Sequence, residues 1–227
     1  MAYRKVLQWP DKNLQKKSED VVHGDESILD LFRDMIDTLK IERGAGLAAP
    51  QIGINQNVVV IDLGEMASPS NITQKLTDEL VDERYWLLLN PKLDTSRETQ
   101  RWSEGCLSVP WVSAEVERHS VCTVNYLTSD FKTKTVSLSW PLSGAVQHEC
   151  DHLDGNLFLD KLSRLKSSRL KKYILKKRKK IEDYKDDLLT DHEEKKIGKK
   201  KKSAHLRKKE IQKRKAVKKL NSRSRSS

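Results

Sequence analysis

The stretch Gln147-His-Glu-Cys-Asp-His152 determines how we interpret this chain. It contains H-E-x-x-H within residues 142–157, where Leu, Ala and Val recur at helical spacing. On a helix, residues i and i+4 lie on one face about a turn apart, so His148 and His152 can reach one metal ion. Glu149 then lies beside the ion without having to ligate it. The motif predicts a metal-binding helix, and a surface or core histidine pair is the alternative interpretation.

Two imidazoles leave a tetrahedral ion short of ligands, and a third protein ligand with one open water position is typical of a catalytic site. Downstream of the motif the candidates are Asp154, Asp160 and residues of the tail, without an extended metalloprotease pattern. Upstream, Cys106 lies in the run WSEGCLSVP (102–110), where Gly105 is expected to allow close backbone approach. We therefore predict Cys106 as the third ligand.

The other two cysteines are expected in the core. Cys122 falls inside the strand-like run Val121-Cys-Thr-Val124, and Cys150 lies two positions from each histidine, off their helical face. Three cysteines, an odd number in a chain of 227 residues, argue against a disulfide framework and for a reducing compartment. We expect a cytoplasmic protein.

The run Gly44-Ala-Gly-Leu-Ala-Ala-Pro-Gln51 superficially resembles a dinucleotide-binding glycine loop. That loop follows a strand and opens a helix, whereas here a helix is expected before it and a strand after it, so we reject a nucleotide site. A structural turn is the favoured interpretation. The alternative is that Gln51 donates an amide hydrogen bond to a substrate oxygen.

The rest of the first 160 residues predicts an α+β fold with small antiparallel sheets wrapped around the central metal-binding helix. An amphipathic helix is expected from residue 28, with Asp25 or Ser27 as N-cap and its end at the Gly44/Gly46 pair. A long surface loop is expected over 64–84. The expected strands are short apolar runs at 57–62, 86–90, 114–117, 121–126 and 133–140.

Charge divides the chain into two parts, and the basic part is divided again by its apolar content. Residues 1–160 carry 16 Lys and Arg against 25 Asp and Glu and are expected to form the catalytic domain, whereas residues 161–227 carry 28 against 8. Residues 161–189 are expected to form a basic helix, and 190–227 a disordered tail rich in Lys, Arg and Ser. The chain start lacks the apolar segment of a signal peptide, and apolar runs are too short to span a bilayer.

Taken together, the segments GAGLAAPQ, EGCLS and QHECDHLDG, in this order, resemble the three signature motifs of peptide deformylase, and the resemblance extends from about Val6 to Lys180. It implies that Cys106, His148 and His152 hold the metal and that Glu149 is the general acid/base. It also implies that Gln51 and the Leu107 backbone N–H form an oxyanion hole. By the same resemblance the substrate lies along Gly44, Ala45 and Gly46.

The family implies a substrate and a cofactor. The substrate is the N-formyl-methionyl end of a nascent polypeptide, whose Met side chain would enter a pocket near Ala45, Leu107 and the start of the His148 helix. The cofactor is one Fe(II), with Zn(II), Ni(II) and Co(II) as alternatives, since the ligand set does not choose among them. We expect a monomer without membrane contacts, whose basic tail docks on the ribosome or its RNA or else stays solvated.

Two features depart from the family pattern. Ser113 stands where members often have an Arg or Tyr near the substrate backbone, and the 64–84 loop is longer than usual. Two other functions stay open at this point: a metalloprotease that cuts internal peptide bonds, and a nucleic-acid-binding protein whose metal is structural. The cysteine and Gln51 motifs favour neither.

Overall fold

The computed structural model describes residues 2–24, 27–64 and 84–185. The expected tail (190–227), most of the expected 64–84 loop and the N-cap candidate Asp25 lie outside these ranges. The chain forms two compact units, residues 1–174 and 175–227, and we consider each by itself.

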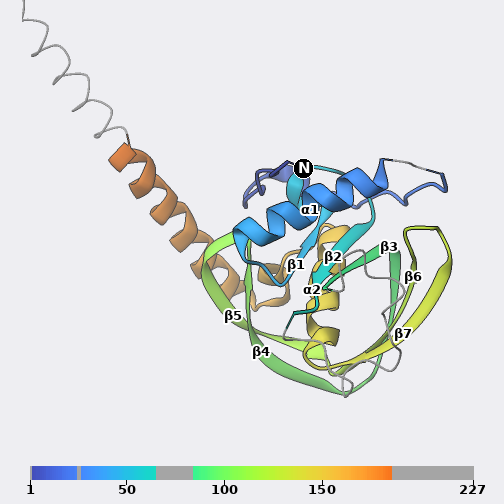
Figure 1. The fold of residues 1–227 in the computed structure, drawn as a ribbon. Helices are drawn as coiled ribbons and strands as arrows, with labels where there is room; N and C mark the ends of the chain where they lie inside the picture. Colours follow the sequence, from blue (N-terminus) through green and yellow to red (C-terminus); the bar gives the residue numbers. More distant parts are fainter. Residues whose placement is uncertain (1, 25–26, 65–83, 186–227) are drawn as a thin grey trace, which may run out of the picture. The chain divides into compact units, whose positions relative to one another are not determined.

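The first unit combines helices and strands in mixed order (Figure 1). The helices are α1 (Ile28–Glu42) and α2 (Leu142–Leu153), with short 3-10 turns η1 (Lys12–Gln15), η2 (Ala49–Ile52) and η3 (Phe158–Lys161). The strands are β1 (Gly46–Ala48), β2 (Val58–Asp62), β3 (Tyr85–Thr95), β4 (Thr99–Cys106), β5 (Val109–His119), β6 (Val121–Leu127) and β7 (Thr133–Ser139).

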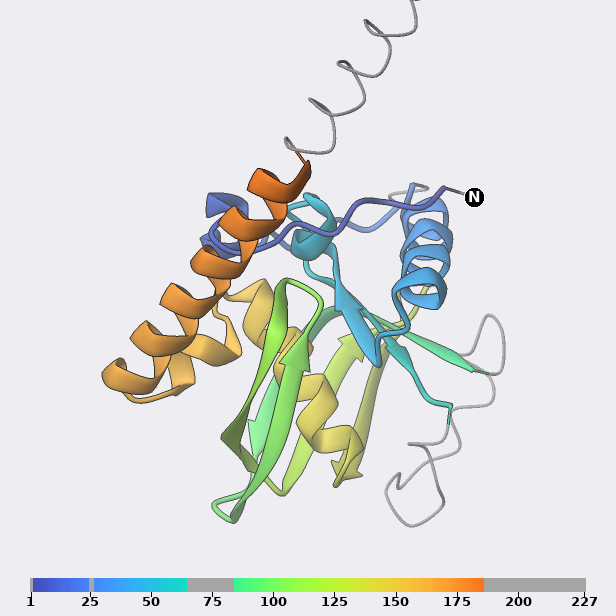
Figure 2. The same cartoon turned by 90° about the vertical axis from the view of Figure 1, so that its left-hand side faces the viewer.

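The strands form two antiparallel sheets. Five strands pair in the order β1-β2-β3-β6-β7, and β4 pairs with β5 as a separate hairpin. In the larger sheet Gly46 of β1 lies opposite Ile61 of β2. The views in Figures 1 and 2 show α2 enclosed by the curving strands. The predicted α+β fold, with antiparallel sheets around a central helix, is therefore confirmed.

The apolar run of β2 is explained by burial on both faces. Because alternate side chains of a strand point to opposite faces, Val58 and Val60 pack into the cluster that contains α1, whereas Val59 and Ile61 pack into the cluster that contains α2. A strand covered on one face only would have alternated with polar residues. The sheet thus fixes α2 from one side, and the β4–β5 hairpin, which contributes Cys106, approaches its other side.

Three details differ from the sequence expectations. The predicted glycine turn is correct only at its start, where Arg43 ends α1 in the left-handed region (φ 56°), because Gly46–Ala48 then forms the edge strand β1. Strand β4 was not expected, since its run TQRWSEGC is mostly polar and largely unburied. Helix α2 ends at Leu153 rather than near residue 157, with Gly155 at φ 74° behind it.

A further helix begins at residue 164 and continues to the last described residue, 185. Within the first unit, Ile174 is fully buried in a cluster with Val116 and Phe158, with Leu170 packed against that cluster. Residues 175–185 belong to the second unit and carry many Lys residues. None of the helices in the described ranges combines the length and apolar character that a membrane crossing requires.

Candidate active site

The three predicted metal ligands come together from two elements. His148 and His152 occupy successive turns of α2, and Cys106 ends β4. One ligand atom from each residue lies within 4.8 Å of the others, and Cys106 Sγ is 3.3 Å from His152 Nε2. A thiolate and two imidazoles at this separation form a donor set for one borderline-soft divalent cation, with one tetrahedral position left for water.

A buried carboxylate orients the first histidine. His148 Nδ1 lies 2.8 Å from Glu104 Oε2, which leaves Nε2 as the nitrogen available to a metal. Glu104 is itself held by Arg118, whose Nε and Nη2 donate to its two oxygens at 2.6 and 3.0 Å. The indole of Trp102 also donates to Glu104, at 3.0 Å. The ring of His148 is therefore fixed before any metal binds.

The charged side chains that surround Glu104 form ion pairs with one another. Arg118 is 2% exposed and also donates to Asp151, which accepts a second ion pair from Lys161 at 3.0 Å. Burial alone would raise the pKa of Glu104, but hydrogen bonds from Arg118 and His148 lower it to about 2. Glu104 is thus an anion. A carboxylate that accepts the other ring N–H of a metal-binding histidine increases the basicity of that histidine.

The two histidines differ electrostatically in the absence of a cation. Burial lowers the pKa of His152 well below its ordinary value, assisted by the charges of His148 and Arg118. Burial also disfavours the charged form of His148, yet hydrogen bonds that its ring donates to Cys106 and Glu104 raise its pKa well above the ordinary value. The surroundings of His148 thus favour positive charge beside the Cys106 thiol, which is the charge that a metal would supply.

Glu149 follows His148 on α2, and one of its carboxyl oxygens has no hydrogen-bond partner among the described residues. Its Oε2 is buried and forms no hydrogen bond with any described residue. Burial, the largest cause, raises the pKa of the Glu149 carboxyl to about 7. An unsatisfied buried carboxyl is expensive unless a ligand or water completes it, so this oxygen independently indicates a bound group next to the three ligands.

Gly46 gives Glu149 the space that it occupies. A Cβ at position 46 would lie 2.6 Å from Glu149 Oε1, closer than any side chain tolerates. At Gly44 a Cβ would meet the side chains of Leu107 and Leu39 at 2.9 Å. By contrast, no described atom lies within 4 Å of a Cβ at Gly105, so the close approach expected there is absent.

Gln51 is oriented by its own backbone turn. Its Oε1 accepts the Ala48 N–H at 2.8 Å, which directs Nε2 to Ser108 Oγ at 3.2 Å and to Cys106 Sγ at 3.6 Å. Gln51 is 1% exposed. The amide therefore presents a donor at the thiol, which is the orientation that the substrate-oxygen alternative needs, while also closing the turn.

Two of the three ligands, Cys106 and His148, line a cleft of about 620 Å³. Its lining residues come from the α1–β1 turn, the β4–β5 hairpin and α2. The lining includes the expected substrate-binding residues Gly44, Ala45 and Gly46 together with Leu107. The start of α2 contributes Ala145. A larger cavity of about 750 Å³ borders Gln147, Cys150 and Asp151, but none of the three ligands lines it.

The remaining cysteines lie where the sequence predicted. Cys122 is fully buried in the sheet core, where burial raises the pKa of its thiol to about 12. Cys150 is partly buried and packs against the same core. Neither contributes to the group of three metal-binding side chains.

Three functional partners were not identified from the sequence: Glu104, Arg118 and Asp151. A signal for Arg118 existed, because Ala114, Val116 and Arg118 share one face of β5 by alternation, and all three are buried. An arginine on a core face requires a buried anion. Nothing in the sequence alone identified Glu104 or Asp151 as that anion, since both lie beside motif residues that already had roles.

Comparison with known proteins gives one consistent result. The family model described as polypeptide deformylase matches residues 3–168. A peptide deformylase of Erythrobacter litoralis (strain HTCC2594) is 38% identical over 194 residues, covering 80% of this chain and 98% of the relative. The crystal structure of a peptide deformylase from Legionella pneumophila has a TM-score of 0.67 at 35% identity, covering 78% of this chain and 96% of that one.

A second solved structure contains a ligand. The crystal structure of peptide deformylase from Ehrlichia chaffeensis in complex with actinonin has a TM-score of 0.68 at 31% identity. It covers 78% of this chain and 98% of its own. The similarity thus includes nearly the whole of each relative.

Proposed function

The chain belongs to the peptide deformylase family and removes N-formyl groups, and we propose that Cys106, His148 and His152 hold Fe(II) for this reaction. Zn(II), Ni(II) and Co(II) fit the same donor set and are the alternatives. When bound, the metal polarises a water molecule and the formyl oxygen, so that both attack and charge development are easier. The substrates are the formyl-methionyl ends of nascent polypeptides.

Glu149 carries the proton. It accepts a proton from the water that attacks the formyl carbon and delivers it to the leaving amine, after which formate and the free peptide depart. A pKa near neutrality suits a group that must both take and give a proton, and burial raises the pKa of Glu149 to about 7. Its unpartnered Oε2 supports this role, since no described residue competes for it.

Two donors stabilise the oxyanion that forms on the attacked carbon. Gln51 Nε2 points to the Cys106 thiol from a side chain fixed by the Ala48 N–H, so little reorganisation is needed when charge develops. The backbone N–H of Leu107 is the second donor. Because both act on charge that exists mainly in the transition state, they raise the rate more than they tighten substrate binding.

The substrate backbone lies along Gly44, Ala45 and Gly46. Glycines at 44 and 46 leave the backbone of this wall without side chains, because side chains there would collide with Leu107 and Glu149. The methionine side chain occupies the apolar part of the cleft near Ala45, Leu107 and Ala145. Ser113, which also lines the cleft, replaces the larger residue that family members often use there.

The observation that carries the proposal is the group of one thiol and two imidazoles within 4.8 Å of one another. The test is anaerobic reconstitution with Fe(II), Ni(II), Co(II) or Zn(II), followed by measurement of formate released from formyl-Met-Ala-Ser. Turnover with Fe(II) that decays in air supports the proposed metal. Absence of formate with every metal would contradict it. Inhibition by actinonin, the ligand of the Ehrlichia chaffeensis structure, would locate the activity at this cleft.

We also propose that the protein works in the cytoplasm as a monomer and that its basic C-terminal part docks on the ribosome. Residues 161–227 carry 28 Lys and Arg against 8 Asp and Glu, and counterion release draws such a segment to RNA. Deletion of residues 190–227 should weaken co-sedimentation with ribosomes at low salt and leave turnover of a short formyl peptide unchanged. Unaltered co-sedimentation would exclude docking through this tail.

A further inference from the structure

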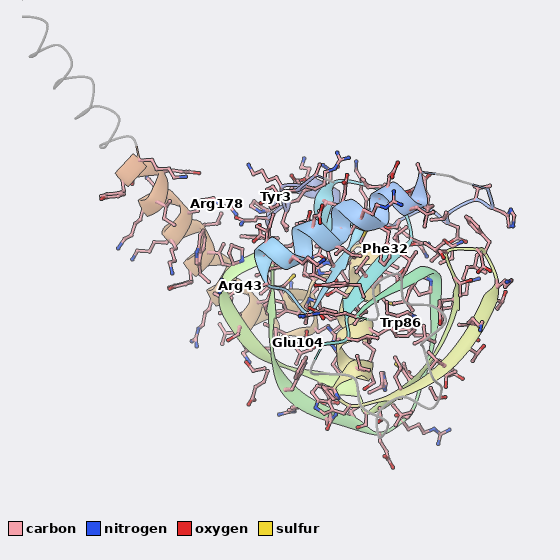
Figure 3. The ribbon with its side chains drawn as sticks, in the orientation of Figure 1. Tyr3, Phe32, Arg43, Trp86, Glu104 and Arg178 are labelled. Carbon is pink, nitrogen blue, oxygen red and sulfur yellow. The ribbon has the colours of Figure 1, made fainter. Side chains whose placement is uncertain are left out.

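The outer rim of the cleft carries an arginine that the reaction does not use. Arg43 lines the cleft at the turn between α1 and β1, and Figure 3 labels it at the C-terminal end of α1. Its side chain is exposed and has no ion-pair or hydrogen-bond partner among the described residues. The neighbouring Glu42 accepts a hydrogen bond from Tyr3 at 2.8 Å. Arg43 is therefore an available cation at the cleft entrance.

The acidic groups of the cleft do not neutralise this cation. Glu104 is 2% exposed and is occupied by Arg118 and His148. Glu149 is 5% exposed and lies at the catalytic end. Among the described residues that line the cleft, the exposed charge is therefore the cation of Arg43, and no exposed Asp or Glu balances it.

The β4–β5 hairpin contributes an aromatic and conformationally constrained residue to the cleft lining. Trp111 of β5 lines the same cleft and keeps 40% of its surface exposed. Its φ is 69°, a left-handed conformation that costs a bulky residue about 1 kcal/mol or more. Such a cost is usually retained at ligand-contacting positions.

The position of Arg43 identifies the part of the substrate that it meets. Gly46 marks the reacting end of the wall, because it contacts Glu149. Arg43 lies three residues before it, in the left-handed turn that ends α1, where the chain is exposed. A peptide that leaves the buried centre for solvent along this wall therefore brings its second or third residue to Arg43.

We propose that Arg43, together with Trp111 of the same cleft lining, makes this deformylase select formyl-methionyl chains whose second or third residue is Asp or Glu. This selectivity rests on the proposed placement of the substrate along Gly44–Gly46. The attraction acts on an exposed charge and before the chemical step, so it lowers KM and leaves kcat nearly unchanged. It is also screened by salt.

The test compares four C-terminally amidated peptides, so that no terminal carboxylate reaches Arg43. They are formyl-Met-Ala-Ser, formyl-Met-Glu-Ser, formyl-Met-Ala-Glu and formyl-Met-Ala-Lys. We expect kcat/KM for at least one Glu peptide to exceed that for the Lys peptide about three- to fivefold at low salt, as an exposed charge contact allows. The ratio should fall towards one at 0.5 M NaCl and in Arg43→Gln.

The matched control is Arg33→Gln, which removes the same charge from α1 at a residue paired with Asp30, 2.9 Å away, outside the cleft lining. It should keep the wild-type ratio. Equal kcat/KM for Glu and Lys peptides in an enzyme that turns over formyl-Met-Ala-Ser would overturn the selectivity and leave the deformylase function intact. An unchanged ratio in folded Arg43→Gln would overturn it as well. If none of the four peptides were deformylated, both the selectivity and the proposed substrate placement and metal site would be overturned.

Discussion

His148 Nδ1 lies 2.8 Å from Glu104 Oε2, so one of the two ring nitrogens of this histidine is already bonded to a buried anion. Replacing Glu104 with Gln removes the charge that orients the ring and that pairs with Arg118. We expect metal affinity to fall about 10- to 100-fold, as for other loss of histidine-orienting groups. We also expect a loss of about 3 kcal/mol in unfolding free energy, because Arg118 loses a buried partner. Chelator competition and urea unfolding measure these two effects.

Glu117→Gln is the matched control for that variant. Glu117 lies on β5 and forms an exposed ion pair with Arg101 at 3.4 Å, which should contribute less than about 1 kcal/mol. Metal affinity should be unaltered. If Glu104→Gln behaved like Glu117→Gln in both measurements, the carboxylate would have no part in holding the histidine.

A methyl group at position 46 should disrupt catalysis directly. In Gly46→Ala the new carbon would begin 2.6 Å from Glu149 Oε1, so the carboxylate or the strand must shift. A shift of this size in a proton-transfer group should lower kcat about 100-fold. Gly105→Ala is the control, because no described atom lies within 4 Å of its added carbon. Equal formate release from the two variants would show that Glu149 does not need the space beside Gly46.

Replacing Trp111 should make the protein more stable and weaken its binding of substrate. Because it holds φ at 69°, Trp111→Gly relieves an unfavourable backbone conformation and should raise the unfolding free energy by up to about 1 kcal/mol. The same change removes the aromatic wall of the cleft and should raise KM for formyl-Met-Ala-Ser. Thermal unfolding and steady-state kinetics separate the two effects. An increase in stability without an increase in KM would make Trp111 a structural feature only.

Asp34 on α1 should contribute to acid sensitivity. Burial opposes its charge, but hydrogen bonds from Arg4 and the Ala2 N–H lower its pKa below the ordinary 3.8. A lowered folded-state pKa means that the contribution to stability is present above pH 4 and is lost as pH falls through the folded value. Asp34→Asn should therefore be less stable than wild type at pH 7, and the difference should shrink on acidification.

The control for that variant is Asp30→Asn, which removes a charge from an exposed pair on the same helix. Urea unfolding from pH 7 to pH 3 gives the difference for each variant. A constant gap between wild type and Asp34→Asn across this range would contradict the linkage.

The sequence predicted those parts of the fold that have a strong local signal. The apolar spacing of α1 and α2, and the β-branched run of β2, follow from burial on one or both faces. Strand β4 escaped prediction because it forms a hairpin with mostly exposed side chains. β1 escaped because Gly and Ala have low strand propensity, and its pairing with β2 is a tertiary effect.

The site residues also differ in how well the sequence alone predicts them. Motif residues on one helix could be placed from sequence, because helical geometry brings His148 and His152 together. Cys106 could be proposed as the third ligand from the lack of suitable residues downstream, but the 41 residues between it and His148 leave its position undetermined by local rules. The Arg118–Glu104 pair depends on how the hairpin packs against α2, which periodicity does not specify.

The central claim is that Glu149 moves the proton beside a metal held by Cys106, His148 and His152. The most direct measurement compares wild type with Glu149→Gln, each reconstituted anaerobically with Fe(II), for metal content and for formate released from formyl-Met-Ala-Ser. We expect equal metal content and a loss of turnover of about 100-fold or more, as for removal of a general acid/base. Turnover near the wild-type rate in a fully metallated Glu149→Gln would contradict the account.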